Sequence, residues 1–275
     1  MKRTLMRRSL AAGLMMAAMG TMSATGAQAA VALRTHAKKC AADSVAAGTV
    51  CLDKYEASVW RIPDATTTNA GLVRKIEQGR ATRADLTAGG ATQLGTESDD
   101  FAPCADNGQN CADDIFAVSL PSEIPSSHIT WFQAQEACAN SGKRLPTSAE
   151  WQMGANGTPD PGPDDGTTDC NSGSDFVSAT GSRSACVSAR GAYDMVGNLE
   201  EWVADWVPLS AGCSGWGGFS DDRMCLSGAS EATGGPGALI RGGSFVDGAN
   251  AGPLSILGAI RTITTFSFIG FRCAR

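Results

Sequence analysis

Histidine is nearly absent from this chain, which contains only His36 and His128. Zinc and iron sites built from three histidines are therefore excluded by counting. A Ser-His-Asp triad would have to use one of these two residues, and no Gly-x-Ser-x-Gly motif supports such a triad. The shortage of histidine thus argues against the common histidine-based hydrolases and metalloenzymes.

The chain also lacks an apolar run long enough to remain in a membrane. Its candidate, residues 10–19, follows four basic residues and precedes the small-residue sequence Ala27-Gln28-Ala29. This pattern is typical of a signal peptide, here residues 1–29, and the run is too short to span a bilayer. The first cysteine is Cys40, too far along to carry a lipid anchor. We therefore expect an exported protein (periplasmic, cell-surface or secreted) that does not insert into the membrane.

An excess of basic residues is absent as well. Loss of Lys2, Arg3, Arg7 and Arg8 with the signal peptide leaves 18 of the 22 basic residues against 28 acidic ones, a balance of −10. Such an acidic surface argues against nucleic acids and anionic membranes as partners.

Cysteine, by contrast, is abundant. All ten cysteines follow the expected cleavage site, and their number is even, which in an exported chain predicts disulfides rather than thiols or zinc sites. Sequence alone does not fix the connectivity. Pairing of sequential neighbours would close short loops at Cys40–Cys51, Cys104–Cys111, Cys170–Cys186 and Cys213–Cys225, which leaves Cys138 and Cys273.

Three segments have the apolar pattern of strands. Residues 50–60 predict a first strand with Tyr55 and Val59 on its buried face, residues 115–120 a short one, and residues 239–245 a strand that enters a glycine turn. Between the first two, residues 63–110 are rich in Ala, Thr, Gly and Asp. We interpret them as a long insertion with a weak helix near residues 73–78.

Two helices have clear start and stop signals. Thr130 with Gln133 forms a predicted capping box for the first, which ends at Gly142. Thr147 with Glu150 does the same for the second, and the Asn-Gly pair at 156–157 stops it.

Residues 193–206 combine two tryptophans and four carboxylates around a Gly-Asn turn. One interpretation is a hard cation held by Asp194, Glu201 and carbonyls of the turn, because Ca²⁺ accepts several oxygens in flexible geometry. The other is a polar hairpin with its acids in water and its tryptophans over the core. The Pro- and Asp-rich residues 158–169 leave a similar choice, and there we favour a solvated loop over a calcium site.

Four motifs in order resemble the formylglycine-generating (sulfatase-modifying factor) family: Arg144-Leu145-Pro146-Thr147-Ser148-Ala149-Glu150-Trp151, Gly197-Asn198-Leu199-Glu200-Glu201-Trp202, Arg241-Gly242-Gly243-Ser244-Phe245 and Gly270-Phe271-Arg272-Cys273. The strand around Tyr55-Glu56 resembles the family's opening strand. The resemblance implies a domain over residues 50–275, preceded by an N-terminal extension over residues 30–49. It implies an α/β (α+β), C-type-lectin-like fold with a small twisted antiparallel sheet, two helices and long disulfide-tied loops.

The resemblance also implies a structural Ca²⁺ ion. By position, its ligands would be Asp194, Gly197, Leu199 and Glu201, and Asn171 would belong to the family's other calcium site, for which no matching acid is evident. The family joins its helix cysteine to the closing Phe-Arg-Cys, which supports a Cys138–Cys273 disulfide.

The copper chemistry of the family is not expected here. Formylglycine-generating enzymes hold copper with two cysteines after the Arg-Gly-Gly-Ser-Phe turn, and soft thiolates suit Cu(I). The matching positions are Asp247 and Gly252, and no cysteine lies between Cys225 and Cys273. We therefore expect no copper and no formylglycine oxidase activity.

Residues 246–268 lie between two family motifs and resemble the variable region of retroelement-diversified ligand-binding proteins. On a rigid scaffold such a segment can change with little loss of stability. We expect an exported ligand-binding protein, with an unknown protein or cell-surface ligand, whether the segment is diversified or fixed; the alternative is an oxidoreductase of the same family. The candidate binding residues are Asp247, Asn250, Ser255, Ile256, Leu257, Ile260, Arg261, Thr262, Thr264 and Phe266.

Overall fold

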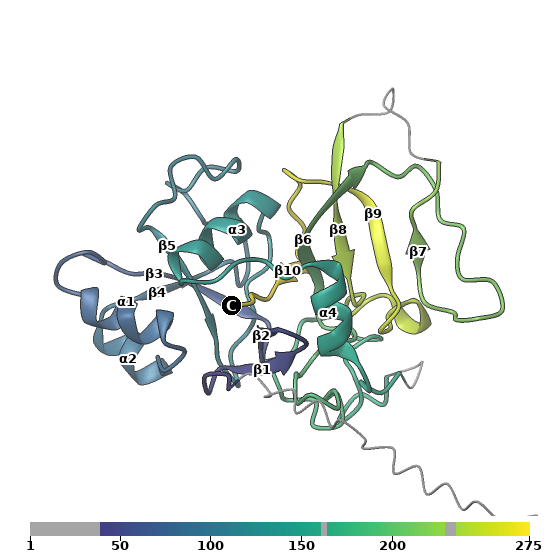
Figure 1. The fold of residues 1–275 in the computed structure, drawn as a ribbon, viewed down its shortest axis with the longest axis horizontal. Coiled ribbons are helices and arrows are strands. Elements are labelled where there is room, and N and C mark those ends of the chain that lie inside the picture. Colours follow the sequence, from purple (N-terminus) through teal and green to yellow (C-terminus); the bar gives the residue numbers. More distant parts are fainter. Residues whose placement is uncertain (1–38, 161–163, 229–234) are drawn as a thin grey trace, which may run out of the picture. The chain divides into compact units, whose positions relative to one another are not determined.

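The structure is a computed structural model that describes residues 39–160, 164–228 and 235–275. The predicted signal peptide and His36 lie outside the described residues. The chain divides into two units, residues 1–36 and 37–275, and we describe the second (Figure 1). Among the described residues, no helix is both long enough and apolar enough to cross a membrane.

A hairpin and a three-stranded sheet form the first part of the domain. Strands β1 (Ser44–Ala47) and β2 (Val50–Asp53) pair with each other, and β3 (Ala57–Arg61) lies between β4 (Thr92–Leu94) and β5 (Ile115–Ser119), all antiparallel. The strand expected over residues 50–60 is therefore two strands. Because β1 pairs with β2 and Cys40 is bonded to Cys51, the folded unit begins before residue 50.

A five-stranded sheet forms the second part and lies to the right in Figure 1. Its order is β10-β6-β8-β9-β7, made of β6 (Glu200–Pro208), β7 (Met224–Cys225), β8 (Pro236–Arg241), β9 (Ile256–Arg261) and β10 (Ile269–Phe271). The central pairs β6–β8 and β8–β9 are antiparallel, but β10–β6 and β7–β9 are parallel. The α/β class is confirmed, while the single small antiparallel sheet is replaced by three sheets within the described residues.

Both strongly marked helices are present. Helix α3 (Trp131–Asn140) begins at a Thr130–Gln133 capping box, and α4 (Ser148–Ala155) begins at a Thr147–Glu150 box. In each box the threonine hydroxyl accepts from the third backbone N–H of the helix, which would otherwise lack a partner. Helix α3 packs on β5, and α4 packs against β1, β2 and the five-stranded sheet.

The insertion over residues 63–110 is more ordered than its composition indicates. It contains α1 (Ala70–Glu77), α2 (Arg83–Ala88) and β4, and its apolar residues form a separate core with one face of β3 and β5. Leu72, Ile76 and Leu86 are buried there against Trp60 and Phe116. These few apolar side chains, spaced for helices, outweigh the polar composition from which we expected only a weak helix near residues 73–78, where α1 lies.

Five disulfides include all ten cysteines of the chain: Cys40–Cys51, Cys104–Cys111, Cys138–Cys273, Cys170–Cys186 and Cys213–Cys225. These are the same pairs as those considered from the sequence. The Cys138–Cys273 bond closes the longest loop and joins α3 to the residues that follow β10. Beyond it, residues 273–275 pair with β2, so the two ends of the domain lie side by side.

Candidate functional site

The acidic segment forms an irregular turn that leads into β6. Asp194, Gly197 and Asn198 all have positive φ angles, of 56°, 70° and 58°. A side chain on residue 197 would collide with the backbone of Asn171, since its Cβ would lie 2.4 Å from the carbonyl oxygen. Glycine is therefore required by both conformation and space. The parallel pairing of β6 with β10 then brings Arg272 next to Glu201.

Arg272 is fully buried and is the main cation of this region. Its Nε donates to both carboxylate oxygens of Glu201, at 2.9 and 2.7 Å, and its terminal nitrogens donate to the carbonyls of Tyr193 and Asp53 at 2.9 and 3.2 Å. Trp151 donates to the same carboxylate at 2.8 Å. One guanidinium thus ties β6, the acidic turn and β2 together.

Glu56 is a third buried acid at this point, and sequence analysis did not identify it as a site residue. Its two oxygens accept from the Leu199 backbone N–H at 2.9 Å and from the Asn198 amide at 2.5 Å. Burial, followed by the charges of Asp194 and Glu201, raises the pKa of Glu56 well above its usual value. Burial also raises the pKa of Asp194 to about 6. Three carboxyl groups therefore share one guanidinium, and negative charge is in excess.

The turn offers oxygen atoms for the Ca²⁺ ion that the resemblance implies, although both carboxylate oxygens of Glu201 already accept from Arg272. Among the contacts of the described residues, the carbonyl oxygens of Gly197 and Leu199 accept no hydrogen bond, which leaves them available as ligands. Asp194 and Glu201 are 1% exposed, so these acids do not face water as a polar hairpin would require. A bound Ca²⁺ would supply positive charge to a buried, acid-rich turn.

Asn171 does not fit a cation site. Its side-chain oxygen accepts hydrogen bonds from Ser174, at 2.5 Å, and from the Arg183 guanidinium, at 3.2 Å, and Arg183 is also paired with Asp164 at 3.1 Å. A fixed positive charge already lies where the second calcium would need oxygen ligands. We therefore do not retain Asn171 as a metal ligand.

The two positions that match the copper cysteines have other partners. Asp247 accepts from the Ser244 hydroxyl and N–H, both at 2.8 Å, and forms an ion pair with Arg223. Gly252 is packed against Asp222 so closely that a Cβ would lie 1.9 Å from its Oδ1. Since all ten cysteines are in disulfides, the chain offers no thiolate here.

Arg223 also binds Glu200, with 3.1 Å between its Nη1 and Oε1. The other carboxylate oxygen of Glu200 is buried and has no hydrogen-bond partner among the described residues. Burial raises the pKa of Glu200 to about 7, against the lowering effect of Arg223. Arg223 thus joins Glu200 at the start of β6 to Asp247 in the segment of residues 246–268.

A pocket of about 440 Å³ opens beside this group. It is lined mainly by the loop before β7, including Trp216, Asp221, Asp222 and Arg223, and by Asn250 from the segment predicted to bind a ligand. Sequence analysis identified Asn250 but missed the loop, because loop residues without a family motif give no signal of their location.

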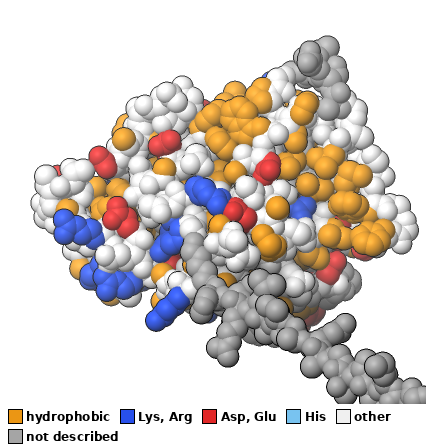
Figure 2. Space-filling view, in the orientation of Figure 1, with side chains coloured by type: hydrophobic (Ala, Val, Ile, Leu, Met, Phe, Trp, Pro, Cys, Tyr) orange, Lys and Arg blue, Asp and Glu red, His pale blue; other side chains and the backbone are white. Residues whose placement is uncertain are grey.

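The predicted binding residues fall into three sets by exposure. Ser255, Leu257 and Thr262 are buried, Leu257 within β9 and the other two just beyond its ends, so they do not reach the surface. Ile256, Ile260 and Thr264 are half-buried, as is Asp247. Asn250, Arg261 and Phe266 are exposed, as are the neighbouring Val246 and Ile263. Figure 2 shows hydrophobic side chains gathered over the five-stranded sheet and near α3.

Two exposed loops, residues 246–254 and 261–268, are both connected to Glu200. Its backbone N–H donates to the carbonyl of Phe268 at 2.9 Å, and its side chain shares Arg223 with Asp247. The loop of residues 261–268 is also held by two backbone hydrogen bonds. The N–H of His128 donates to the carbonyl of Phe266, and the N–H of Trp131 donates to the carbonyl of Thr262. Both loops are therefore held on a rigid base.

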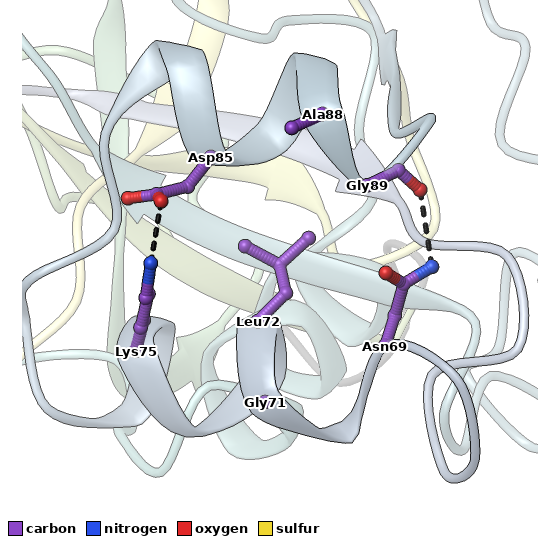
Figure 3. Close-up of a pocket in the computed structure, with 7 residues that line it drawn as sticks. All are labelled: Asn69, Gly71, Leu72, Lys75, Asp85, Ala88 and Gly89. Carbon is purple, nitrogen blue, oxygen red and sulfur yellow. Dashed lines mark hydrogen bonds and ion pairs between the residues drawn. The ribbon is translucent and has the colours of Figure 1, made fainter.

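A second pocket, between α1 and α2, is an interhelical contact (Figure 3). Lys75 and Asp85 form an ion pair across it at 2.5 Å, and the Asn69 amide donates to the carbonyl of Gly89 at 3.0 Å. Leu72 fills the space between the helices. Because these polar groups already hold the two helices together, we do not take this pocket as the functional site.

Comparison with known families identifies the domain. The profile of the sulfatase-modifying factor enzyme 1-like domain matches residues 42–275. The chain belongs to this family. The match includes the acidic turn, the glycine turn and the closing strand, and it begins at residue 42, just before β1.

Two curated relatives match over shorter stretches. A formylglycine-generating enzyme from Thermomonospora curvata is 34% identical over 101 residues, which cover 30% of this chain and 33% of that protein. A hercynine oxygenase from Mycolicibacterium smegmatis is 28% identical over 140 residues, which cover 46% of this chain and 31% of that protein. The chain thus spans about a third of the length of each of these relatives.

Solved structures with a related architecture include PvdO from Pseudomonas aeruginosa, with a TM-score of 0.41 and 21% identity over 82% of this chain and 80% of that one. The P3c variant of the Major Tropism Determinant has a TM-score of 0.45 and 17% identity over 84% of this chain and 52% of that one. At these scores the likenesses carry no argument about function.

We predict that removal of Ca²⁺ destabilises the protein. A chelator should lower the melting temperature by about 5–10 °C if calcium is present at about 100 times its dissociation constant. Glu201→Gln, which removes one charged ligand, should reduce this shift. Glu97→Gln, at an exposed acid, should leave it unchanged. Differential scanning calorimetry measures all three proteins, and a wild-type curve insensitive to chelator would contradict the calcium site.

We also predict that Glu200 makes stability depend on pH. Its pKa is about 7 in the folded protein and near its usual value of 4.5 in the unfolded chain, so the folded state binds more protons between these values. Stability should therefore fall as pH rises from 5 to 8, with about 3 kcal/mol of the loss due to this group. Urea unfolding of Glu200→Gln should show a smaller fall, and parallel curves would refute the assignment.

Proposed function

We propose that this protein is an exported ligand-binding protein that uses the family scaffold without the family's copper chemistry. The binding surface is formed by the exposed loops of residues 246–254 and 261–268, together with the pocket before β7. The partner is an unidentified protein or cell-surface ligand, and neither nucleic acid nor membrane insertion is involved. The ends of β9, rather than its buried middle, contribute to this surface.

One observation carries the proposal. The positions of the copper cysteines hold Asp247, which is paired with Arg223, and Gly252, which is packed against Asp222. Carboxylate oxygens and a glycine do not provide the soft ligands that Cu(I) requires. A displaced pair of cysteines is not available either, since every cysteine is in a disulfide.

Exposed apolar side chains support binding at the same place. Val246 and Ile263 are each 57% exposed, and Phe266 is 37% exposed and stacks on Phe268. Large apolar residues in loops on a rigid base are typical of recognition surfaces. Sequencing of residues 246–268 across isolates separates a diversified surface from a fixed one.

The alternative function is oxidoreductase chemistry of the same family. The named relatives, a formylglycine-generating enzyme and a hercynine oxygenase, favour it. Within this chain, it would have to operate at the Glu200–Arg223–Asp247 group without a thiolate.

Binding to intact bacterial cells, measured by flow cytometry with the labelled mature protein, tests the binding proposal. We expect Val246→Ser and Phe266→Ser to weaken binding about tenfold or more, because truncation of a central apolar contact costs 1.4 kcal/mol or more. Met153→Ser, at a half-exposed apolar residue of α4, is the matched control and should bind normally. Equal binding by all variants would place the surface elsewhere.

A peptide assay separates the two functions. With Cu(I) and oxygen, the purified protein should leave the cysteine of a sulfatase-type peptide unchanged, because no thiolate is available to hold the metal. Mass spectrometry detects the product. Formation of formylglycine would establish the oxidoreductase and overturn the proposal that the copper chemistry is lost.

A further inference from the structure

Three aspartates from two distant segments converge next to the pocket before β7. Asp160 follows α4, and Asp221 and Asp222 directly precede Arg223 and β7. One carboxylate oxygen from each lies within 4.8 Å of the others. Like charges at this separation repel each other unless a proton or a cation lies between them.

Asp222 is the member of the cluster that most needs a positively charged partner. It is 2% exposed, and its Oδ1 is buried without a hydrogen-bond partner among the described residues. Its Oδ2 accepts from the N–H of Leu254 at 2.6 Å, and the side chains of Ser220 and Asp160 also lie within hydrogen-bonding reach of its carboxyl group. Buried carboxylate oxygens are almost always paired, because removing them from water costs several kcal/mol. Burial raises the pKa of Asp222, and the negative charge of Asp221 adds to this effect.

The basic residues nearby are bound to other groups. Arg223 is paired with Glu200 and Asp247, and Arg241 donates to the carbonyls of Ser255 and Pro253 and to Gln152. No ion pair in the described part of the chain includes Asp221 or Asp222. Within the described residues, Asp221 and Asp222 therefore have no protein cation at bonding distance.

We propose that Asp160, Asp221 and Asp222 bind a Ca²⁺ ion, at a site separate from the acidic turn of Asp194 and Glu201. All three ligands are hard carboxylate oxygens, which suit Ca²⁺, Mg²⁺ or Mn²⁺ rather than soft metals. Because they lie on loops rather than on a rigid octahedral frame, the flexible coordination of Ca²⁺ fits best.

The ion would connect the end of α4 to the wall of the pocket. Asp160 and Asp221 are exposed, so the ion would be open to solvent on one side and would exchange freely. We therefore expect weak binding, with a dissociation constant of about 0.1–1 mM, as is typical of extracellular calcium modules.

Isothermal titration of the chelator-treated mature protein with CaCl₂ tests the proposal. We expect a weak site in the wild type that is also present in Glu201→Gln, because Glu201 belongs to the other site. In Asp221→Asn and Asp160→Asn this site should weaken tenfold or more. Both altered residues are on the surface, so these variants should fold even if Asp222→Asn does not. Glu97→Gln, at an exposed acid outside the cluster, is the matched control and should bind as the wild type does.

Two results would overturn the proposal. In the first, the wild type binds Ca²⁺ only at the site that Glu201→Gln removes, even when the Ca²⁺ concentration reaches 10 times the dissociation constant expected for the new site. In the second, Asp221→Asn and Asp160→Asn bind Ca²⁺ as the wild type does. Either result would mean that a proton shared by Asp160 and Asp222, rather than a metal ion, relieves the repulsion.

Discussion

The Arg272 guanidinium is the interaction on which the rest of the structure depends. It lies fully buried between Glu201 and the carbonyls of Asp53, Lys54, Tyr193 and Asp194, so a single side chain contacts the first hairpin, the acidic turn and the five-stranded sheet. A buried charge of this kind is tolerated only when its partners are complete. The parallel pairing of β10 with β6, the glycine turn and the Cys138–Cys273 disulfide all serve to keep Arg272 in place.

The charge distribution separates the molecule into two acid-rich regions with different accessibility. Around Arg272, Glu56, Asp194 and Glu201 are enclosed, and their role is to hold the turn. In the second region, Glu200 and Asp247 are paired with Arg223, and the neighbouring loops have exposed side chains. The scaffold thus combines an enclosed acidic centre with a second acidic region next to exposed loops. This arrangement is consistent with a family whose members share a fold while their chemistry differs.

Sequence reasoning predicted most of the framework and much less of the site. Helices α3 and α4 were predictable because a capping box, apolar spacing and a stop agree. The acidic turn was located by its motif. Glu56, Arg183 and Arg223 were missed as partners, because their roles depend on contacts between segments 12 to 143 residues apart in the sequence. The burial of Ser255, Leu257 and Thr262 was also missed, since an irregular sequence gave no sign of the strand β9 or of which side chains in and beside it face inward.

The position of Arg272 in the chain has a consequence for biosynthesis. Its guanidinium binds the carbonyl of Asp53, 219 residues earlier, and its neighbour Cys273 closes a loop of 135 residues. Until residue 272 has been synthesised, Glu56, Asp194 and Glu201 have no cation to share, and burying them would be strongly unfavourable. The acidic turn should therefore stay open until residues 269–275 are available. A messenger truncated a few codons early would yield a polypeptide with nearly all of its apolar core and no means to close it.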